Sequence, residues 1–437
     1  MSASKTTPAL KTSANSITEQ VRLHSLDTTR GIAVMAILLI NIWGFGLPFE
    51  AYANPNAYGG IDGWNLTSWF ISAVFFEGTA RGLFSLLFGA GFILMLNRLE
   101  KLGMHGMDIY TRRLGWLLLF GLFHGYILLW TGDILFRYAV MGFLLLAFRS
   151  VKPKTLLVLT VLLLLLDVAR YQFFTETKML EVREKATISQ TLKDGDTVLT
   201  EQQQNNLQAW EEMQKPFDQE LVDEDVKGYQ GSYSDSFKLS IKWMEAQATY
   251  LFNYAIFDIL VMFFIGAALM KLGFWQQGFA TRSLCLMVLI GYGIGLSARY
   301  YYVQAEIASD FDIYSRMAYA EYKNIWRILV TIGHLGVITL FCRSGILMFL
   351  QKALGNVGRM ALTNYISQTI LASIFFYGTF MGNYAKLERV ELWYVVAAIW
   401  TFNIVFSHVW LKLYYYGPLE WLWRALTYGD LPEMKRS

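Results

Sequence analysis

The chain has 437 residues, of which 55% are hydrophobic, 16% aromatic and 16% charged, and its mean hydropathy is +0.35. Soluble domains carry about 25% charged residues, so this composition excludes an ordinary soluble protein and predicts an integral membrane protein. The formal net charge of +3 is too small to indicate a nucleic-acid partner. Cys285 and Cys342 fall in apolar stretches, so we expect neither a disulfide nor a cysteine-based metal site.

The N-terminal part begins with a polar segment, 1–21, which we expect to be a disordered cytoplasmic tail. Before the first apolar run, Asp27 and Arg30 lie three residues apart, so they share a helix face and can pair. Asn41 follows about 15 Å further along the helix, near the bilayer centre. These residues favour a functional membrane helix; a cytoplasmic topology signal with a packing asparagine is the alternative.

Ten apolar runs have the length of about 17–25 residues that a transmembrane helix needs. They lie at 31–48, 66–97, 114–130, 132–149, 155–172, 246–270, 280–302, 325–342, 361–381 and 391–412. Lys and Arg gather in alternate connections, which places both termini in the cytoplasm by the positive-inside rule. The sequence therefore predicts an all-α, polytopic membrane protein with about ten transmembrane helices.

One long polar segment, 173–245, separates two membrane regions of five helices each, 22–172 and 246–437. We expect this segment outside the cytoplasm, with an amphipathic helix near 201–214. The two membrane regions show no repeat of each other, so an inverted-repeat transporter is not supported.

The second apolar run carries Glu77 and Arg81, four residues apart and near mid-membrane, and glycines that predict a kink or break. Ionisable groups inside a membrane usually face a cavity or a partner. Mutual neutralisation and a polar substrate pocket are both compatible with this spacing. The small residues of 84–91 favour close approach of another helix.

The third and fourth runs carry the densest polar cluster. His124 lies roughly 9 Å inside the outer end of its helix, and Asp133 and Arg137 lie one turn apart at the start of the next. The connection is short, so the two helices must be antiparallel neighbours and His124 can approach Asp133. A histidine oriented by a carboxylate is the usual general base. The alternative is a helix-hairpin lock in which Asp133 caps its helix.

Other polar residues in the apolar runs are weaker candidates. Asp258 is a single carboxylate, and His334 and His408 are lone histidines. The glycines of 291–295 indicate helix packing, because no strand precedes them as nucleotide binding requires. No zinc motif, phosphate loop or nucleophile elbow is present, and the sequence predicts no metal site.

Several short strings resemble a known family. They are Gly358–Tyr365 with Gln368, Gly417–Arg424, and shorter matches at 26–31, 84–89 and 124–135. From Arg22 to Tyr428 the chain resembles the bacterial YeiB-like membrane proteins of domain of unknown function 418. The resemblance implies a multi-pass protein of the bacterial inner membrane. Asn364 and Gln368 of the first string join the candidate substrate-binding residues.

A more distant resemblance concerns the Asp-x-x-Arg-Gly start, the later Arg112-Arg113-Leu string and the helix hairpin that follows. These features resemble transmembrane acyltransferases of the heparan-alpha-glucosaminide N-acetyltransferase type, which move an acetyl or acyl group across the membrane onto a sugar. Those enzymes place a catalytic histidine in the outer loop between the first two spans. Here that loop, 49–65, contains no histidine, and His124 lies on the same predicted face of the membrane.

Two functions remain open at this stage. The first is acyl or acetyl transfer to an envelope glycan, lipid or small molecule, with His124 and Asp133 as base. An anionic donor, such as acyl or acetyl coenzyme A, would be held by Asp27, Arg30, Arg112 and Arg113. The second is an inner-membrane transporter or exporter with Glu77, Arg81, Asp258 and His334 along its path. We expect contact with membrane lipids in both cases, and leave a homo-oligomer open.

Overall fold

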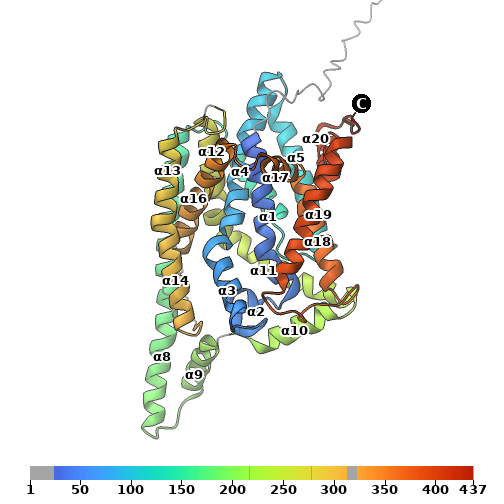
Figure 1. Cartoon of the computed structure of the whole chain (residues 1–437). Helices are drawn as coiled ribbons and strands as arrows, with labels where there is room; N and C mark the ends of the chain where they lie inside the picture. Colours follow the sequence, from blue (N-terminus) through green and yellow to red (C-terminus); the bar gives the residue numbers. More distant parts are fainter. Residues whose placement is uncertain (1–23, 216, 277, 313–321, 437) are drawn as a thin grey trace, which may run out of the picture.

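The computed structural model describes residues 24–215, 217–276, 278–312 and 322–436 (Figure 1). All secondary-structure elements assigned within these residues are helices, which confirms the predicted all-α class. The predicted tail 1–21 lies outside the described residues. Long helices run side by side along the height of the molecule, and the segment 177–214 extends beyond them at one end (Figure 1).

The first half of the chain supplies both largely buried and largely exposed helices of the bundle. Its helices are α1 (His24–Gly46), α2 (Glu50–Ala53), η2 (Pro55–Ala57), α3 (Trp64–Ile71), η3 (Ser72–Phe76), α4 (Thr79–Lys101), α5 (Gly106–Tyr126), α6 (Leu135–Leu146), α7 (Pro153–Arg170), η4 (Tyr171–Glu176), α8 (Thr177–Asp194), α9 (Glu201–Gln214) and α10 (Gln219–Gln230). The α9 helix confirms the helix predicted near 201–214.

The second half supplies the remaining helices, of which α12 (Val261–Lys271) is almost completely buried. Its helices are α11 (Tyr233–Ala255), η5 (Ile256–Leu260), α12 (Val261–Lys271), α13 (Thr281–Ile290), η6 (Gly291–Leu296), α14 (Ser297–Ala308), α16 (Lys323–Ser344), α17 (Met348–Arg359), α18 (Ala361–Phe376), α19 (Leu392–Leu413) and α20 (Pro418–Tyr428). The short segments η3 to η6 are π-helical turns, which occur within longer helices and often at functional sites.

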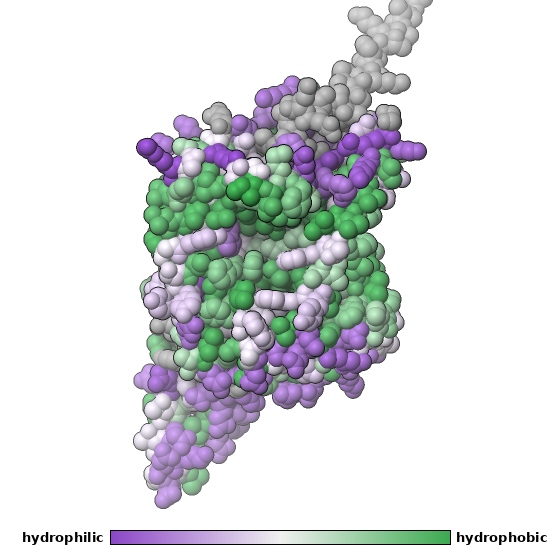
Figure 2. Space-filling model, viewed as in Figure 1, coloured by the Kyte–Doolittle hydropathy of each residue, from purple (hydrophilic) through white to green (hydrophobic). Residues whose placement is uncertain are grey.

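Six helices of the described residues are long and apolar enough to cross a membrane. They are His24–Gly46, Trp64–Lys101, Pro153–Asp194, Thr281–Ala308, Lys323–Ser344 and Leu392–Leu413. The other four predicted spans coincide with α5, α6, the run from α11 to α12, and α18, which do not meet this standard. A predominantly apolar band lies between two hydrophilic ends in Figure 2. The count of ten and the cytoplasmic side stay predictions.

Glycines let the central helices cross in close contact, as the small residues of 84–91 predicted. A Cβ placed on Gly89 of α4 would collide with the backbone carbonyl of Phe263 in α12, and one on Gly266 would collide with that of Leu86. The same device joins α1 to α17, where Gly358 lies against the Asp27 carbonyl. Backbones that approach this closely gain packing contacts that side chains would prevent.

The second predicted span is broken, as its sequence indicated. The π-helical turn η3 ends at Phe76, and Gly78 then adopts a positive φ of 70° before α4 begins at Thr79. A left-handed backbone is readily available only to glycine, which explains the residue at this point. The break frees the segment Glu77–Gly78 to line a cavity inside the bundle.

Candidate functional site

A cavity of about 400 Å³ lies toward the α10 end of the bundle, and we call it the α10 cavity. Its walls come from α1, the break before α4, the turn before α6, α10, α14 and α16. The charged residues that line it are Glu77, Arg81, Arg137, Asp225, Arg299, Lys323 and Arg327. The predicted candidate Asn41 also lines it, so the structure brings Asn41, Glu77, Arg81 and Arg137 together in one place.

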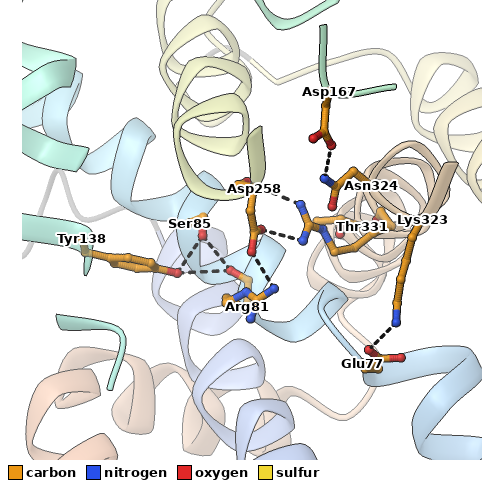
Figure 3. Close-up of polar contacts among 10 residues, drawn as sticks. Glu77, Arg81, Ser85, Tyr138, Asp167, Asp258, Lys323, Asn324 and Thr331 are labelled. Atoms are coloured by element: carbon orange, nitrogen blue, oxygen red, sulfur yellow. Dashed lines mark hydrogen bonds and ion pairs between the residues drawn. The ribbon is translucent and has the colours of Figure 1, made fainter. Parts of the chain in front are cut away.

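Glu77 is shared by two cations from different helices. Its carboxylate lies 3.3 Å from Nη2 of Arg299 in α14 and 3.1 Å from Nζ of Lys323 in α16, and the Lys323 contact is visible in Figure 3. Arg299 also donates from Nε to the Ala73 carbonyl at 2.7 Å. Glu77, which the sequence paired with Arg81 in one interpretation, therefore links the broken helix to α14 and α16.

Asp258 of η5 is also shared by two cations. One carboxylate oxygen lies 2.6 Å from Nη2 of Arg81 (Figure 3) and the other lies 2.6 Å from Nη1 of Arg327. The side chain of Asp258 is only 3% exposed. A buried charge requires partners of this kind, because leaving one uncompensated costs several kcal/mol. Glu77 and Arg81 thus both have partners on other helices, and both face the cavity, which favours the pocket interpretation of their spacing.

The second carboxylate that lines the α10 cavity, Asp225, is held by N–H donors. It accepts hydrogen bonds from the backbone of Phe49 at 2.7 Å and from Nε1 of Trp243 at 2.9 Å. Asp225 lies on α10, in the polar segment outside the membrane spans, and is 1% exposed. Burial raises the pKa of the Asp225 carboxyl, and the two hydrogen bonds only partly oppose that shift.

A second cavity, of about 380 Å³, lies at the opposite end of the bundle beside α20, and we call it the α20 cavity. Five arginines line it: Arg30, Arg98, Arg113, Arg359 and Arg424. The rest of its wall is largely apolar, with Phe84, Leu87, Phe88, Phe92, Met95 and Leu117 among the lining residues. A cationic rim over an apolar wall has the chemistry of a site for an anionic amphiphile.

The one carboxylate that we find among the described residues of that wall, Glu420, is occupied by a helix terminus. It accepts hydrogen bonds from the backbone N–H groups of Leu362 at 2.6 Å and Thr363 at 3.0 Å, and from the Thr363 hydroxyl at 2.6 Å. A carboxylate stabilises the start of a helix, here α18, through such bonds. All three of these hydrogen bonds to Glu420 come from the first turn of α18. Burial raises the pKa of the Glu420 carboxyl.

The predicted donor-binding residues separate into two groups at this cavity. Arg30 lies 3.1 Å from Asp27, which confirms that pair, and Arg30 lines the cavity. Arg113 also lines it and places its guanidinium 3.4 Å from the ring centre of Trp423. Arg112 instead donates to the Thr427 carbonyl at 3.4 Å and is not among the lining residues.

His124 and Asp133 line neither cavity and meet inside the bundle, beside residues that do. Nδ1 of His124 lies 2.7 Å from Oδ1 of Asp133, and Nε2 lies 2.8 Å from the hydroxyl of Thr369 in α18. The imidazole is fully buried and 5.0 Å, between ring centres, from Tyr365, which lines the α20 cavity. The turn that holds Asp133 contributes Trp130 and Ile134 to the wall of the α10 cavity.

A second polar contact separates the cavities. Oη of Tyr138, which lines the α20 cavity, lies 2.7 Å from Oγ of Ser85 and donates to the carbonyl of Arg81 at 3.2 Å (Figure 3). Arg81 itself lines the α10 cavity. The barrier between the two cavities is therefore only a few side chains thick at this point.

The remaining predicted residues lie in neither cavity. Asn364 donates to the Val357 carbonyl at 3.0 Å and to Ser407 at 2.8 Å, and Gln368 donates to the Val34 carbonyl at 3.1 Å. His334 contacts the Tyr292 hydroxyl at 2.7 Å and the Phe75 carbonyl at 2.9 Å. These contacts join neighbouring helices, so Asn364 and Gln368 act in packing in this arrangement.

Sequence reasoning missed much of both charged walls. In the α10 cavity the missed residues are Asp225, Arg299, Lys323 and Arg327, and in the α20 cavity they are Arg98, Arg359, Glu420 and Arg424. A usable signal existed for Arg299 and Arg327, since each is a cation inside or at the edge of an apolar run. No comparable signal marks Asp225, which stands in a polar helix with many carboxylates.

An all-helical bundle in which six helices of the described residues are long and apolar enough to cross a membrane indicates the class of polytopic helical membrane proteins. The chain is 30% identical over 423 residues to the uncharacterized protein YxaH of Bacillus subtilis (strain 168), across 93% of this chain and 94% of that protein. It is 30% identical over 411 residues to the uncharacterized protein YeiB of Escherichia coli (strain K12), across 92% and 95%. The family model described as "Protein of unknown function (DUF418)" matches residues 269–430.

The chain therefore belongs to the DUF418 family of YeiB-like proteins, as the sequence strings indicated. No solved structure matches it.

Proposed function

We propose that this protein transfers an acyl or acetyl group from an anionic donor in the α20 cavity to an acceptor in the α10 cavity. The observation that carries the proposal is the position of His124. Its imidazole is oriented by Asp133, contacts the Thr369 hydroxyl and packs beside Tyr365 of the α20 cavity, while Trp130 and Ile134 on either side of Asp133 line the α10 cavity. A histidine in this arrangement can remove a proton from an attacking hydroxyl.

The α20 cavity supports the choice of donor. An acyl thioester of coenzyme A combines phosphates with an apolar chain, and the cavity combines five arginines with an apolar wall. Arginine binds phosphate oxygens through paired N–H donors, and burial of a chain gains about 0.8 kcal/mol for each CH₂ group. The start of α1 and the α20 helix border this cavity, which is the end predicted to face the cytoplasm.

The chemical step follows from the two hydrogen bonds of His124. Asp133 fixes Nδ1 as the protonated nitrogen, so Nε2 is free to accept a proton from the acceptor hydroxyl. That oxygen attacks the thioester carbonyl, the carbon–sulfur bond breaks, and the proton passes to the thiolate of the leaving coenzyme A. In the resting protein the Thr369 hydroxyl occupies the place at Nε2, and the acceptor hydroxyl replaces it.

Transport of a small molecule or lipid is the second candidate. It is favoured by the ion pairs that join several helices around the α10 cavity, and by the thin barrier formed by Tyr138, Ser85 and Arg81. Movement of Tyr138 would connect the two cavities. A transporter carries its substrate unchanged, whereas an acyltransferase leaves labelled acyl groups on an acceptor.

The test uses the full chain in proteoliposomes that contain a bacterial envelope extract, with radiolabelled acetyl coenzyme A added on one side. We expect label on an acceptor with the wild-type chain and a loss of about 100-fold with His124→Ala. Arg113→Gln should weaken binding of coenzyme A about tenfold, because a charged hydrogen bond to phosphate is lost. Arg112→Gln is the matched control and should bind like the wild type. Label that crosses the membrane without joining an acceptor would favour the transporter.

A further inference from the structure

Two buried hydrogen-bond donors close to His124 have no hydrogen-bond partner among the described residues. They are Oη of Tyr365, in α18, and Nε1 of Trp130, in the turn that precedes α6. Tyr365 is only 2% exposed and Trp130 only 5%, so neither group is open to solvent. A buried donor without an acceptor costs free energy and is rare in folded proteins, so each of these groups needs an explanation.

The Tyr365 side chain connects the walls of the two cavities. Tyr365 lines the α20 cavity, and its hydroxyl interacts with the Trp130 side chain and the Ile134 backbone without a well-formed hydrogen bond to either. Trp130 and Ile134 both line the α10 cavity. An oxygen atom placed between the Tyr365 hydroxyl and the Trp130 indole would therefore touch the walls of both cavities.

The histidine of the proposed reaction packs against the same tyrosine. The ring centres of His124 and Tyr365 lie 5.0 Å apart in an edge-to-face arrangement. Asp133, which orients His124 through a contact of 2.7 Å, belongs to the turn that holds Trp130 and Ile134. The base and the two unpartnered donors therefore form one cluster.

The Trp130 ring is fixed by close packing. It stacks on Phe45 with ring centres 3.9 Å apart. A Cβ placed on Gly44 would lie 3.2 Å from the indole, and one on Gly132 would lie 2.6 Å from it, so both glycines make room for the ring. A donor that is held in place before a reaction stabilises developing charge without first having to reorganise.

We infer that the Tyr365 hydroxyl and the Trp130 indole N–H form an oxyanion hole for the acyl carbonyl of the donor. This inference rests on the proposed function, because such a pair of donors has a use only where a carbonyl group is attacked. Both residues then touch a reacting atom and are catalytic residues. Their lack of a partner in the free protein is explained, because the oxyanion supplies the missing acceptor.

The two donors act at one step of the reaction. The acceptor oxygen bonds to the thioester carbonyl carbon and gives its proton to Nε2 of His124, while an electron pair of the C=O bond moves to the carbonyl oxygen. Tyr365 and Trp130 donate hydrogen bonds to that oxyanion. The C=O bond then re-forms, the carbon–sulfur bond breaks, and the proton passes from His124 to the leaving thiolate.

Two variants remove one donor each and keep an aromatic ring in its place. Tyr365→Phe should lower kcat in the proteoliposome assay with acetyl coenzyme A by about 100-fold or more, with the KM for acetyl coenzyme A unchanged. Trp130→Phe should lower kcat in the same way. The matched controls are Tyr292→Phe and Trp275→Phe, which remove a hydroxyl and an indole N–H from residues that line neither cavity. Both controls should turn over like the wild type.

An infrared measurement separates this role from a purely structural one. The full chain is loaded with acetyl coenzyme A that carries an isotope label in its carbonyl group, without an acceptor. Hydrogen bonds to the carbonyl oxygen should shift its band to lower frequency than in solution, and Tyr365→Phe should reverse part of that shift. An unshifted band in the wild type would overturn the inference, even if the variants fail to fold.

The activity results also distinguish this inference from the proposed function. Transfer by the wild type with an unchanged kcat in folded Tyr365→Phe, whatever its melting temperature, would overturn only this inference and assign the tyrosine to packing. No transfer by the wild-type chain would overturn the proposed function and this inference with it.

Discussion

The Nδ1 atom of His124 lies 2.7 Å from Oδ1 of Asp133, and this contact joins the last turn of α5 to the turn that precedes α6. Asp133 also accepts a hydrogen bond from the backbone of Phe136 at 2.7 Å, so one carboxylate orients the imidazole and caps the next helix. The two interpretations of this pair, a general base and a helix-hairpin lock, therefore share the same atoms. They differ in what removal of the imidazole does.

Replacement of His124 by alanine separates these interpretations. A general base increases the rate of a reaction by about 100-fold or more, so His124→Ala should lower the rate of acyl transfer by at least that factor. Stability should fall as well, because the Asp133 and Thr369 groups lose a buried partner at a cost of about 1–3 kcal/mol. Turnover normalised to folded protein, measured beside a melting curve, checks this prediction.

Thr369→Val is the matched control for that variant. Valine has the shape of threonine but lacks the hydroxyl at Nε2, so the imidazole keeps its orientation through Asp133. We expect a loss of about 1 kcal/mol in stability and retention of acyl transfer. A His124→Ala protein that is less stable yet turns over like Thr369→Val would leave only the lock.

The crossing of α4 and α12 gives a prediction about stability. Gly89→Ala should destabilise the protein by about 1–3 kcal/mol, because its Cβ would meet the Phe263 backbone and push the helices apart. Gly91, in the same helix, has no atom within 4 Å of such a Cβ. Gly91→Ala should therefore be neutral or stabilising by up to about 1 kcal/mol, as alanine is the better helix former. Equal melting temperatures for the two variants would contradict this account of the crossing.

The sequence predicted helices and contacts correctly where the residues involved are close together in the chain. Apolar runs predicted the long helices, and the three-residue spacing of Asp27 and Arg30 predicted their ion pair. The short connection between two runs predicted the contact of His124 with Asp133. In each case the partners are close in the chain, so helix geometry alone brings them together.

Contacts between distant helices were beyond that kind of reasoning. Asp258 pairs with Arg81 and Arg327, which lie 177 and 69 residues away in the chain, and nothing local selects these partners. The four-residue spacing of Glu77 and Arg81 suggested a pair within one helix, yet each is bound by other helices. Helix packing decides which buried charges meet, and a single sequence does not specify that packing.

The charge of Asp258 should matter more to stability than that of an exposed carboxylate. Asp258→Asn removes the counter-charge of two buried guanidinium groups, and breaking a buried pair of this kind costs about 3–5 kcal/mol. Glu224→Gln is the control, since Glu224 pairs with Lys242 at the surface, where ion pairs contribute at most about 1 kcal/mol. Thermal unfolding of both variants in the same lipid compares the two losses. A loss of stability in Asp258→Asn as small as that in Glu224→Gln would show that the ion pairs of Asp258 are dispensable.

The raised pKa of the Asp225 carboxyl should make the stability of the protein depend on pH. Burial raises its pKa above the ordinary value of 3.8, so the folded protein binds this proton more tightly than the unfolded chain does. Its contribution to stability is therefore fully present below pH 3.8 and is lost as the pH rises through the raised pKa. Asp225→Asn cannot titrate and should lack that loss.

Melting temperatures of the wild type and Asp225→Asn between about pH 4 and about pH 7 test this sign. Asparagine keeps only one oxygen for the two donors, Phe49 and Trp243, so the variant starts less stable at low pH. Because the wild type alone must then ionise a buried carboxyl, the difference between the two proteins should shrink as the pH rises. Asp235→Asn, an exposed carboxyl at a nearby helix start, is the control: hydrogen bonds from Ser232 lower its pKa, so the difference should change in the opposite direction. A wild type that gains stability relative to Asp225→Asn at higher pH would show that the two N–H donors outweigh the cost of burial.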